Sequence, residues 1–111
     1  MKKILLLTLA TIGLAACAGK AATPVQPEVV EVSIIKYQFV PQQLEISKGQ
    51  KVRWVNKEKR QYHSVWFKEQ GKEESDYLFP EDTFEMIFTE QGDFNYVCGP
   101  HPEMTGKIIV K

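Results

Sequence analysis

Alternating apolar and polar residues dominate the chain from residue 28 to its end. The first run places Val30, Val32 and Ile34 on one face, and a period of two is typical of a half-buried β-strand. We expect another strand from His63 to Phe67, and further alternating runs occupy residues 43–46, 51–54, 83–88, 94–98 and 107–111. No stretch of this region combines helical periodicity with a capping residue, so the pattern predicts an all-β fold, a small antiparallel β-sandwich of seven or eight strands.

The first 27 residues have a different character. Two lysines and an apolar run from Ile4 to Leu9 precede Leu14-Ala15-Ala16-Cys17, which is typical of a signal peptide and too short for a spanning helix. The ending resembles the lipobox of bacterial lipoproteins, whose cysteine is lipidated and becomes the first mature residue. We therefore predict a lipoprotein signal peptide over 1–16, a lipidated Cys17 with a flexible tether over 17–27, and one domain over 28–111. An ordinary secretory signal is the alternative.

The export signal predicts a periplasm-facing protein that is anchored to a bacterial membrane through Cys17 or, without the lipid, secreted to the periplasm. Ala18 stands where an inner-membrane retention signal would have Asp, which favours the outer membrane. The chain has 14 basic and 14 acidic residues, and loss of residues 1–16 leaves a formal charge of −2. This balance gives no nucleic-acid footprint, so we expect no nucleic-acid partner. We also expect a monomer.

The residues that carry chemistry gather near the C-terminus. Cys98, His101 and Met104 offer a thiolate, an imidazole and a thioether within seven residues, and His63 is the other of the two histidines in the chain. Two imidazoles, a thiolate and a distant thioether are the ligands of a blue-copper electron-transfer site, whereas methionine is a poor zinc ligand. The sequence thus predicts that His63, Cys98, His101 and Met104 bind one copper ion. Copper binding should weaken in acid, because it needs a thiolate and neutral imidazoles.

Two other interpretations use the same residues. In one, Cys98 is a buried core cysteine, His101 a surface residue beside prolines, and Met104 a core filler. In the other, Cys98 and His101 form a nucleophilic pair, although no orienting residue or oxyanion site can be identified near Cys98. The cysteine count favours copper, because lipidation of Cys17 would leave Cys98 as a lone thiol in an oxidising compartment.

These motifs resemble the cupredoxins, the type 1 blue copper proteins, and residues 37–111 are most similar to the amicyanins within this plastocyanin- and pseudoazurin-like family. The similarity rests on Val52 to Asn56 before His63, on Phe88 to Tyr96, and on the spacing Cys98-x2-His101-x2-Met104. It implies a Greek-key sandwich with the copper site at one pole. His63, Cys98 and His101 would be the equatorial ligands and Met104 the axial one.

Three neighbours of the expected ligands have separate interpretations. By the resemblance, Asn56 would tie the two ligand loops together, although an asparagine before a turn is equally ordinary. Ser64 stands where the family usually has Asn, and Gly99 where it has Thr or Ser. Such neighbours orient ligands and tune the potential, so the resemblance carries over the ligand set but no reduction potential.

The resemblance implies an electron carrier that converts no substrate. Electrons would pass through the solvent-side edge of His101, framed by Pro100 and Pro102 and by Phe79-Pro80, to redox proteins such as a c-type cytochrome, a dehydrogenase, or a terminal oxidase or reductase. The run 57–60, Lys-Glu-Lys-Arg, is either a solvated loop or a patch that steers an acidic partner.

Two other functions would also use copper. A copper-binding carrier or chaperone in copper homeostasis binds the same ion, but such sites usually rely on Met-rich or His-rich clusters that this chain lacks. A copper enzyme with a second metal is poorly supported, because no histidine remains for another site. Rapid transfer of Cu(I) to an acceptor without redox cycling would favour the chaperone.

Overall fold

The structure is a computed structural model that describes residues 28–111, so the predicted signal peptide, the Cys17 anchor and the tether lie outside the described residues. The described part contains one short 3-10 helix, η1 (Lys68–Gln70), and seven strands: β1 (Val29–Ile35), β2 (Gln38–Val40), β3 (Gln43–Ile46), β4 (Lys51–Asn56), β5 (Thr83–Ile87), β6 (Gly92–Val97) and β7 (Thr105–Val110). Over these residues, no helix has the length and apolar character needed to cross a membrane.

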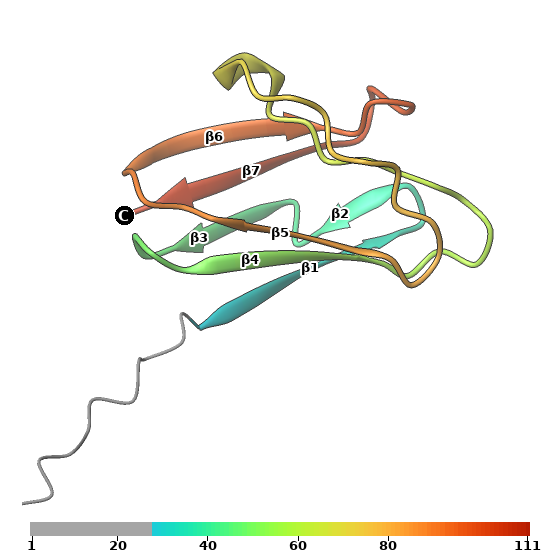
Figure 1. The fold of residues 1–111 in the computed structure, drawn as a ribbon, viewed down its shortest axis with the longest axis horizontal. Helices are drawn as coiled ribbons and strands as arrows, with labels where there is room; N and C mark the ends of the chain where they lie inside the picture. The colour runs from blue at the N-terminus through green and yellow to red at the C-terminus, as the bar shows by residue number, and fades with distance from the viewer. Residues whose placement is uncertain (1–27) are drawn as a thin grey trace, which may run out of the picture.

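The strands form two sheets that face each other (Figure 1). One sheet has the order β2-β1-β4-β5 and the other the order β3-β7-β6. The predicted all-β sandwich is confirmed, but the β1–β4 and β3–β7 pairs are parallel, whereas β1–β2, β4–β5 and β6–β7 are antiparallel. The difference arises because the chain leaves the first sheet after β2, runs through β3 in the second sheet, and returns as β4 alongside β1.

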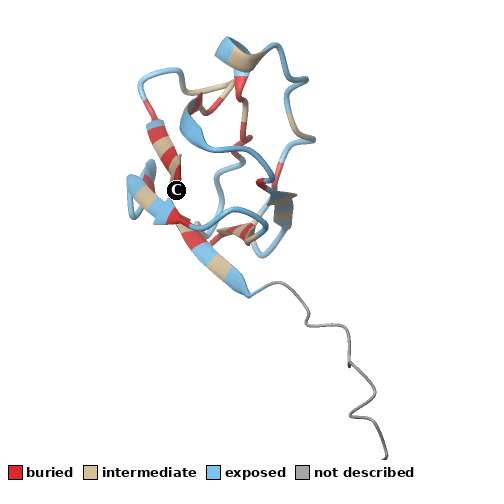
Figure 2. Cartoon of the chain, turned by 90° about the vertical axis from the view of Figure 1, so that its left-hand side faces the viewer, coloured by how far each residue is buried: buried red, intermediate tan, exposed pale blue. Residues whose placement is uncertain are grey.

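A cluster of aromatic rings fills the space between the sheets. The fully buried Trp54 of β4 meets Tyr96 of β6 in a T-shaped contact, with ring centroids 5.5 Å apart, and also contacts Phe67 at 5.9 Å. Phe39 of β2 meets the same Tyr96 ring at 4.7 Å. The alternation of buried and exposed residues along the strands, visible in Figure 2, is the pattern that the sequence predicted. Burial of large aromatic rings supplies much of the hydrophobic free energy of folding.

The segment from residue 63 to residue 67 differs from its prediction as a strand. It forms two isolated bridges, His63 with Leu78 and Trp66 with Val97 at the end of β6. The segment pairs with one neighbour at each end and so passes from the loop before β5 to the second sheet. A regular strand would have to continue along one partner, which this crossing prevents.

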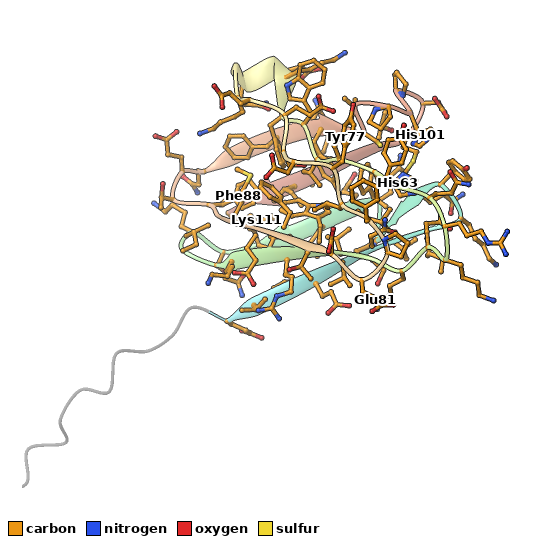
Figure 3. All side chains as sticks on the ribbon, turned by 45° about the vertical axis from the view of Figure 1, so that its right-hand side comes forward. His63, Tyr77, Glu81, Phe88, His101 and Lys111 are labelled. Atoms are coloured by element: carbon orange, nitrogen blue, oxygen red, sulfur yellow. The ribbon has the colours of Figure 1, made fainter. Side chains whose placement is uncertain are left out.

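The two ends of the sandwich carry different features. His63 and His101 lie close together at one end, away from Lys111 (Figure 3). β1 begins and β7 ends at the opposite end (Figure 1). The loops that hold the predicted ligands therefore gather at one pole.

We predict that Gly106→Ala destabilises the metal-free protein, because Gly106 of β7 stands directly opposite Tyr96 of β6 and a Cβ there would overlap the Tyr96 ring. The ring is held on several sides by other aromatic residues, so overpacking should cost about 1–3 kcal/mol. For a domain of this size, that loss lowers the thermal midpoint by roughly 4–8 °C per kcal/mol. Thr105→Ala, at an exposed position of the same strand, is the control and should stay within about 0.5 kcal/mol of wild type. Equal midpoints for the two variants would contradict this account of the packing.

Candidate metal centre

Cys98 is buried at the end of β6. The alternation along this strand turns Phe94, Tyr96 and Cys98 toward the core, and the Cys98 side chain is fully enclosed. Among the described residues Cys98 forms no disulfide. The inward sulfur that the sequence predicted is therefore present.

A tight loop after Cys98 returns His101 to the sulfur. The N–H of Cys98 donates to the carbonyl of Met104 at 3.0 Å, and the N–H of Met104 donates to the carbonyl of His101 at 2.9 Å. Pro100 and Pro102 restrict the backbone on either side of His101, because each proline ring fixes φ. His101 is half-buried, and its Nδ1 lies 3.6 Å from Cys98 Sγ.

His63 approaches the sulfur from a separate loop. Its backbone N–H donates to the carbonyl of Leu78 at 3.1 Å and its carbonyl accepts from the N–H of Leu78 at 2.7 Å. The imidazole is fully buried, with Nδ1 3.7 Å from Cys98 Sγ and Nε2 3.6 Å from a carboxylate oxygen of Glu58. Glu58 belongs to the polar run 57–60, so one member of that run faces the site.

The three donor atoms fit a single metal ion. His63, Cys98 and His101 each offer one donor atom, and these three atoms all lie within 4.8 Å of one another. Metal bonds of about 2.0 Å to nitrogen and 2.3 Å to sulfur, meeting at about 120°, separate N and S by roughly 3.7 Å. The observed N–S distances of 3.6 and 3.7 Å match this spacing, and the cluster can bind one copper ion. Met104, the fourth residue of the predicted set, is buried in the same hydrophobic cluster as Cys98.

Burial governs the protonation of the site in the absence of metal. Desolvation by burial raises the pKa of the Cys98 thiol, although the Ser64 N–H that points at the sulfur opposes this shift. Desolvation by burial and then the neighbouring His101 lower the pKa of His63, while Glu58 acts in the opposite direction. The metal-free site therefore favours a neutral thiol and a neutral buried imidazole, and a bound cation would displace the thiol proton.

The connection between the ligand loops differs from the one that the family resemblance implied. The Asn56 side chain donates to the carbonyls of Gln61 and Leu78, both at 2.8 Å, and accepts from the N–H of Glu58 at 2.9 Å. It thus braces the loop before His63 and does not reach the loop after Cys98. Ser64 joins the two ligand loops instead: its N–H donates to Cys98 Sγ at 3.4 Å.

Tyr37 covers both histidines, a contact that the sequence did not predict. Its ring meets those of His63 and His101 edge-on, with centroids 5.5 and 5.0 Å apart. Tyr37 and Lys36 form the turn between β1 and β2 with φ values of 56° and 52°, a conformation that non-glycine residues rarely adopt. The Tyr37 N–H donates to Glu58 Oε1 at 2.8 Å, which ties this turn to the His63 loop. No glycine or asparagine marks the turn, so the sequence held no signal for it.

Exposed aromatic residues continue outward from His101. The ring of Tyr62 lies 6.4 Å from that of His101, 5.0 Å from that of Tyr77 and 5.8 Å from that of Phe79. We call Tyr37, Tyr62, Tyr77 and Phe79 the aromatic rim; all four are exposed. Phe79 was expected near His101, and it reaches that residue through Tyr62.

Comparison with known proteins points to one family. Residues 4–110 match the model of the cupredoxin-like domain. The chain is 35% identical over 106 residues to amicyanin-alpha of Methylorubrum extorquens, covering 92% of this chain and 88% of the relative. It is 33% identical over 95 residues to amicyanin of Paracoccus versutus, covering 82% and 71%.

Solved structures agree with the sequence matches. The reduced Cu(I) form of an amicyanin point mutant at pH 4 superposes with a TM-score of 0.71 and 30% identity, covering 79% of this chain and 87% of that one. The Cu(I) form of another amicyanin point mutant gives a TM-score of 0.69, also at 30% identity, with the same two coverages. The order of strands, the His-Cys-His cluster and these matches lead to one conclusion: the chain belongs to the cupredoxin-like domain family.

Proposed function

We propose that this protein carries single electrons between redox proteins through a type 1 copper ion, and that it converts no substrate itself. His63, Cys98 and His101 would hold the copper, with Met104 as the axial ligand. Bound copper would supply one-electron chemistry, cycling between Cu(II) and Cu(I). The observation that carries the proposal is the convergence of two imidazole nitrogens on a buried cysteine sulfur at the spacing that a shared ion requires.

The surroundings of the site favour electron transfer over copper delivery. Cys98 and Met104 are buried in the core, and the backbone hydrogen bonds of the ligand loop hold His101. A site held in this way would rearrange little between Cu(II) and Cu(I), which favours fast electron exchange and slow metal release. A copper chaperone has to release its ion to an acceptor, and release is easier from exposed and mobile ligands.

The electron would leave through His101, because His101 is half-buried while His63 is fully enclosed. Pro100, Pro102 and the aromatic rim frame this edge and form an apolar surface for a brief encounter with a redox protein. Electron-transfer interfaces are small, and a patch of this kind fits them. A c-type cytochrome, a dehydrogenase, or a terminal oxidase or reductase would be a suitable partner.

We also propose that Cys17 anchors the protein to a bacterial membrane, facing the periplasm. The lipobox-like residues 14–17 support the anchor, and Ala18 favours the outer membrane. In support, β1 begins at the end of the sandwich opposite to His101 (Figures 1 and 3), so the proposed electron exit lies far from the point where the chain enters the domain. We propose that the protein acts as a monomer.

The copper site can be tested by metal titration. The metal-free protein titrated with Cu(II) should develop an intense thiolate-to-copper absorption band and a type 1 paramagnetic resonance signal at one equivalent. The band should bleach with ascorbate and return on reoxidation. Cys98→Ala should abolish it, because the thiolate is lost, whereas the matched control Cys17→Ala should keep it. A blue Cys98→Ala protein would refute the site, and colourless binding with rapid transfer of Cu(I) to an acceptor would favour the copper chaperone.

The axial ligand can be tested separately. Met104→Leu replaces the thioether with an apolar group of similar volume, and such exchanges usually cost under about 1.5 kcal/mol in stability. The backbone hydrogen bonds of residue 104 stay available, so the loop and copper binding should persist. The reduction potential of the copper-loaded variant should become more positive, because the thioether donor that helps to stabilise Cu(II) is absent. An unchanged potential in voltammetry would exclude Met104 as a ligand.

The stability of the metal-free protein should be greatest between the ordinary pKa of the imidazole, 6.5, and that of the thiol, 9.0. Because the pKa of His63 is lowered by folding, the unfolded chain binds more protons below pH 6.5, and stability falls as the pH falls. Because the pKa of Cys98 is raised, the unfolded chain loses its thiol proton first above pH 9.0, and stability falls as the pH rises. Each group can contribute a slope of at most about 1.4 kcal/mol per pH unit.

Denaturant unfolding with a chelator present, measured from weak acid to above pH 9.0, reports the loss of stability at both ends of the pH range. His63→Leu should flatten the decline between neutral pH and weak acid, and Cys98→Ala should flatten the decline just above pH 9.0. If both variants retained the wild-type slopes, burial of these two groups would not govern the pH dependence.

A further inference from the structure

A chain of hydrogen bonds beside Cys98 involves Glu74, a residue outside the proposed ligand set. The N–H of Gly99 donates to Ser64 Oγ at 2.8 Å, and Ser64 Oγ in turn donates to Glu74 Oε1 at 2.8 Å. Ser64 is fully buried, and its own N–H points at Cys98 Sγ. A hydroxyl has one proton to give, so donation to Glu74 leaves its lone pairs free to accept from Gly99. The carboxylate thereby fixes the direction of the whole chain.

Gly99 has no space for a side chain while this arrangement holds. A Cβ built at Gly99 would overlap the Glu74 carboxylate and would come within 2.9 Å of Ser64 Oγ. The carboxylate therefore occupies the volume that a side chain after the cysteine would take. Glu74 is exposed, and its carboxylate lies at the end of a flexible side chain. A larger residue at position 99 could therefore displace the carboxylate, but only by breaking its hydrogen bond with Ser64.

The carboxylate is also a charge close to the thiolate. It accepts a hydrogen bond from Ser64 Oγ, and the N–H of the same Ser64 points at Cys98 Sγ, so one residue separates the carboxylate from the sulfur. A negative charge beside a metal site stabilises the more positive oxidation state, Cu(II), relative to Cu(I). Because Glu74 is exposed over much of its length, solvent and salt should screen this effect.

We propose that Glu74 is a potential-setting residue: through Ser64 it locks the loop of Cys98 to the loop of His63, and its charge keeps the reduction potential of the site low. The inference rests on the proposed copper function. In this account, Ser64 and Gly99 provide the hydrogen-bonded link between the loops, and Glu74 provides the charge that lowers the potential. Hydrogen bonds to the groups around metal ligands are known to tune metal sites.

The charge is tested with Glu74→Gln in the full-length protein. The glutamine carbonyl can still accept the Ser64 proton, so the variant removes the charge and keeps the hydrogen bond. We expect the midpoint potential to become more positive, corresponding to about a twofold to fivefold shift in the Cu(II)/Cu(I) equilibrium at low salt. A tenfold shift would equal 59 mV for one electron. The difference from wild type should shrink in high salt.

Glu73→Gln is the matched control, because it removes the same charge from an exposed neighbour. It should shift the potential less than Glu74→Gln does. Equal shifts, or no shift from Glu74→Gln, would overturn the role of the charge. Loss of the thiolate-to-copper band in Glu74→Gln would also overturn it, since Glu74 would then be needed for binding and not for tuning.

The lock is tested with Gly99→Ala and a double variant. If Gly99→Ala acts by displacing the carboxylate, it should raise the potential less than Glu74→Ala does, because the displaced charge remains in the protein. The double variant Gly99→Ala/Glu74→Ala should then match Glu74→Ala alone. Such non-additivity is the signature of residues that act through one interaction. Additive shifts would show that residues 99 and 74 act independently and would overturn the lock.

A measurement without copper separates this inference from the proposed function. In the metal-free protein, amide hydrogen exchange at Gly99 should be slow in wild type and in Glu74→Gln, and faster in Ser64→Ala and Glu74→Ala, where the chain is broken. Unchanged exchange in those two variants would overturn the lock even if copper binds. Conversely, a wild-type protein that gives no blue band but shows this exchange pattern would refute the copper function and keep the lock.

Discussion

Enclosure of the Cys98 sulfur in the core is the constraint on which the site depends. The sulfur has no contact with solvent, faces two imidazole nitrogens and receives the N–H of Ser64. In a medium of low polarity, a thiolate is costly unless a cation neutralises it. The fold therefore holds a group whose charged form is stable chiefly when a metal is bound, and the two histidines supply the remaining donors for that metal.

The aromatic core holds this arrangement in place. Tyr96 lies two residues before Cys98 on the same face of β6 and packs against Trp54, Phe39 and Phe67. Movement of the sulfur would disturb rings from both sheets, and close-packed interiors resist such shifts. At the surface, the asymmetry between the enclosed His63 and the half-buried His101 gives the site one accessible edge, which the aromatic rim surrounds.

The sequence predicted the features that depend on local pattern. Alternation of period two gave the strands and the inward direction of Cys98, and the spacing of Cys98, His101 and Met104 within one short loop gave most of the candidate site. Pairing of His63 with that loop came from donor chemistry and family resemblance. The prediction failed where a contact joins distant segments. These contacts are the parallel pairing of β1 with β4, the two isolated bridges of residues 63–67, and the hydrogen-bond partners of Asn56.

By itself, the sequence determined which residues face the core and which donors are available for copper, because strand periodicity and ligand chemistry are properties of the residues themselves. Only the tertiary structure decided what surrounds those donors. Tyr37 reaches both histidines through a turn with positive φ values that no glycine marks in the sequence. Glu74 meets Ser64 and Gly99 because the β4–β5 and β6–β7 connections converge at one pole. Contacts of this kind are set by how the two sheets place their loops in space, and neither residue type nor spacing along the chain encodes them.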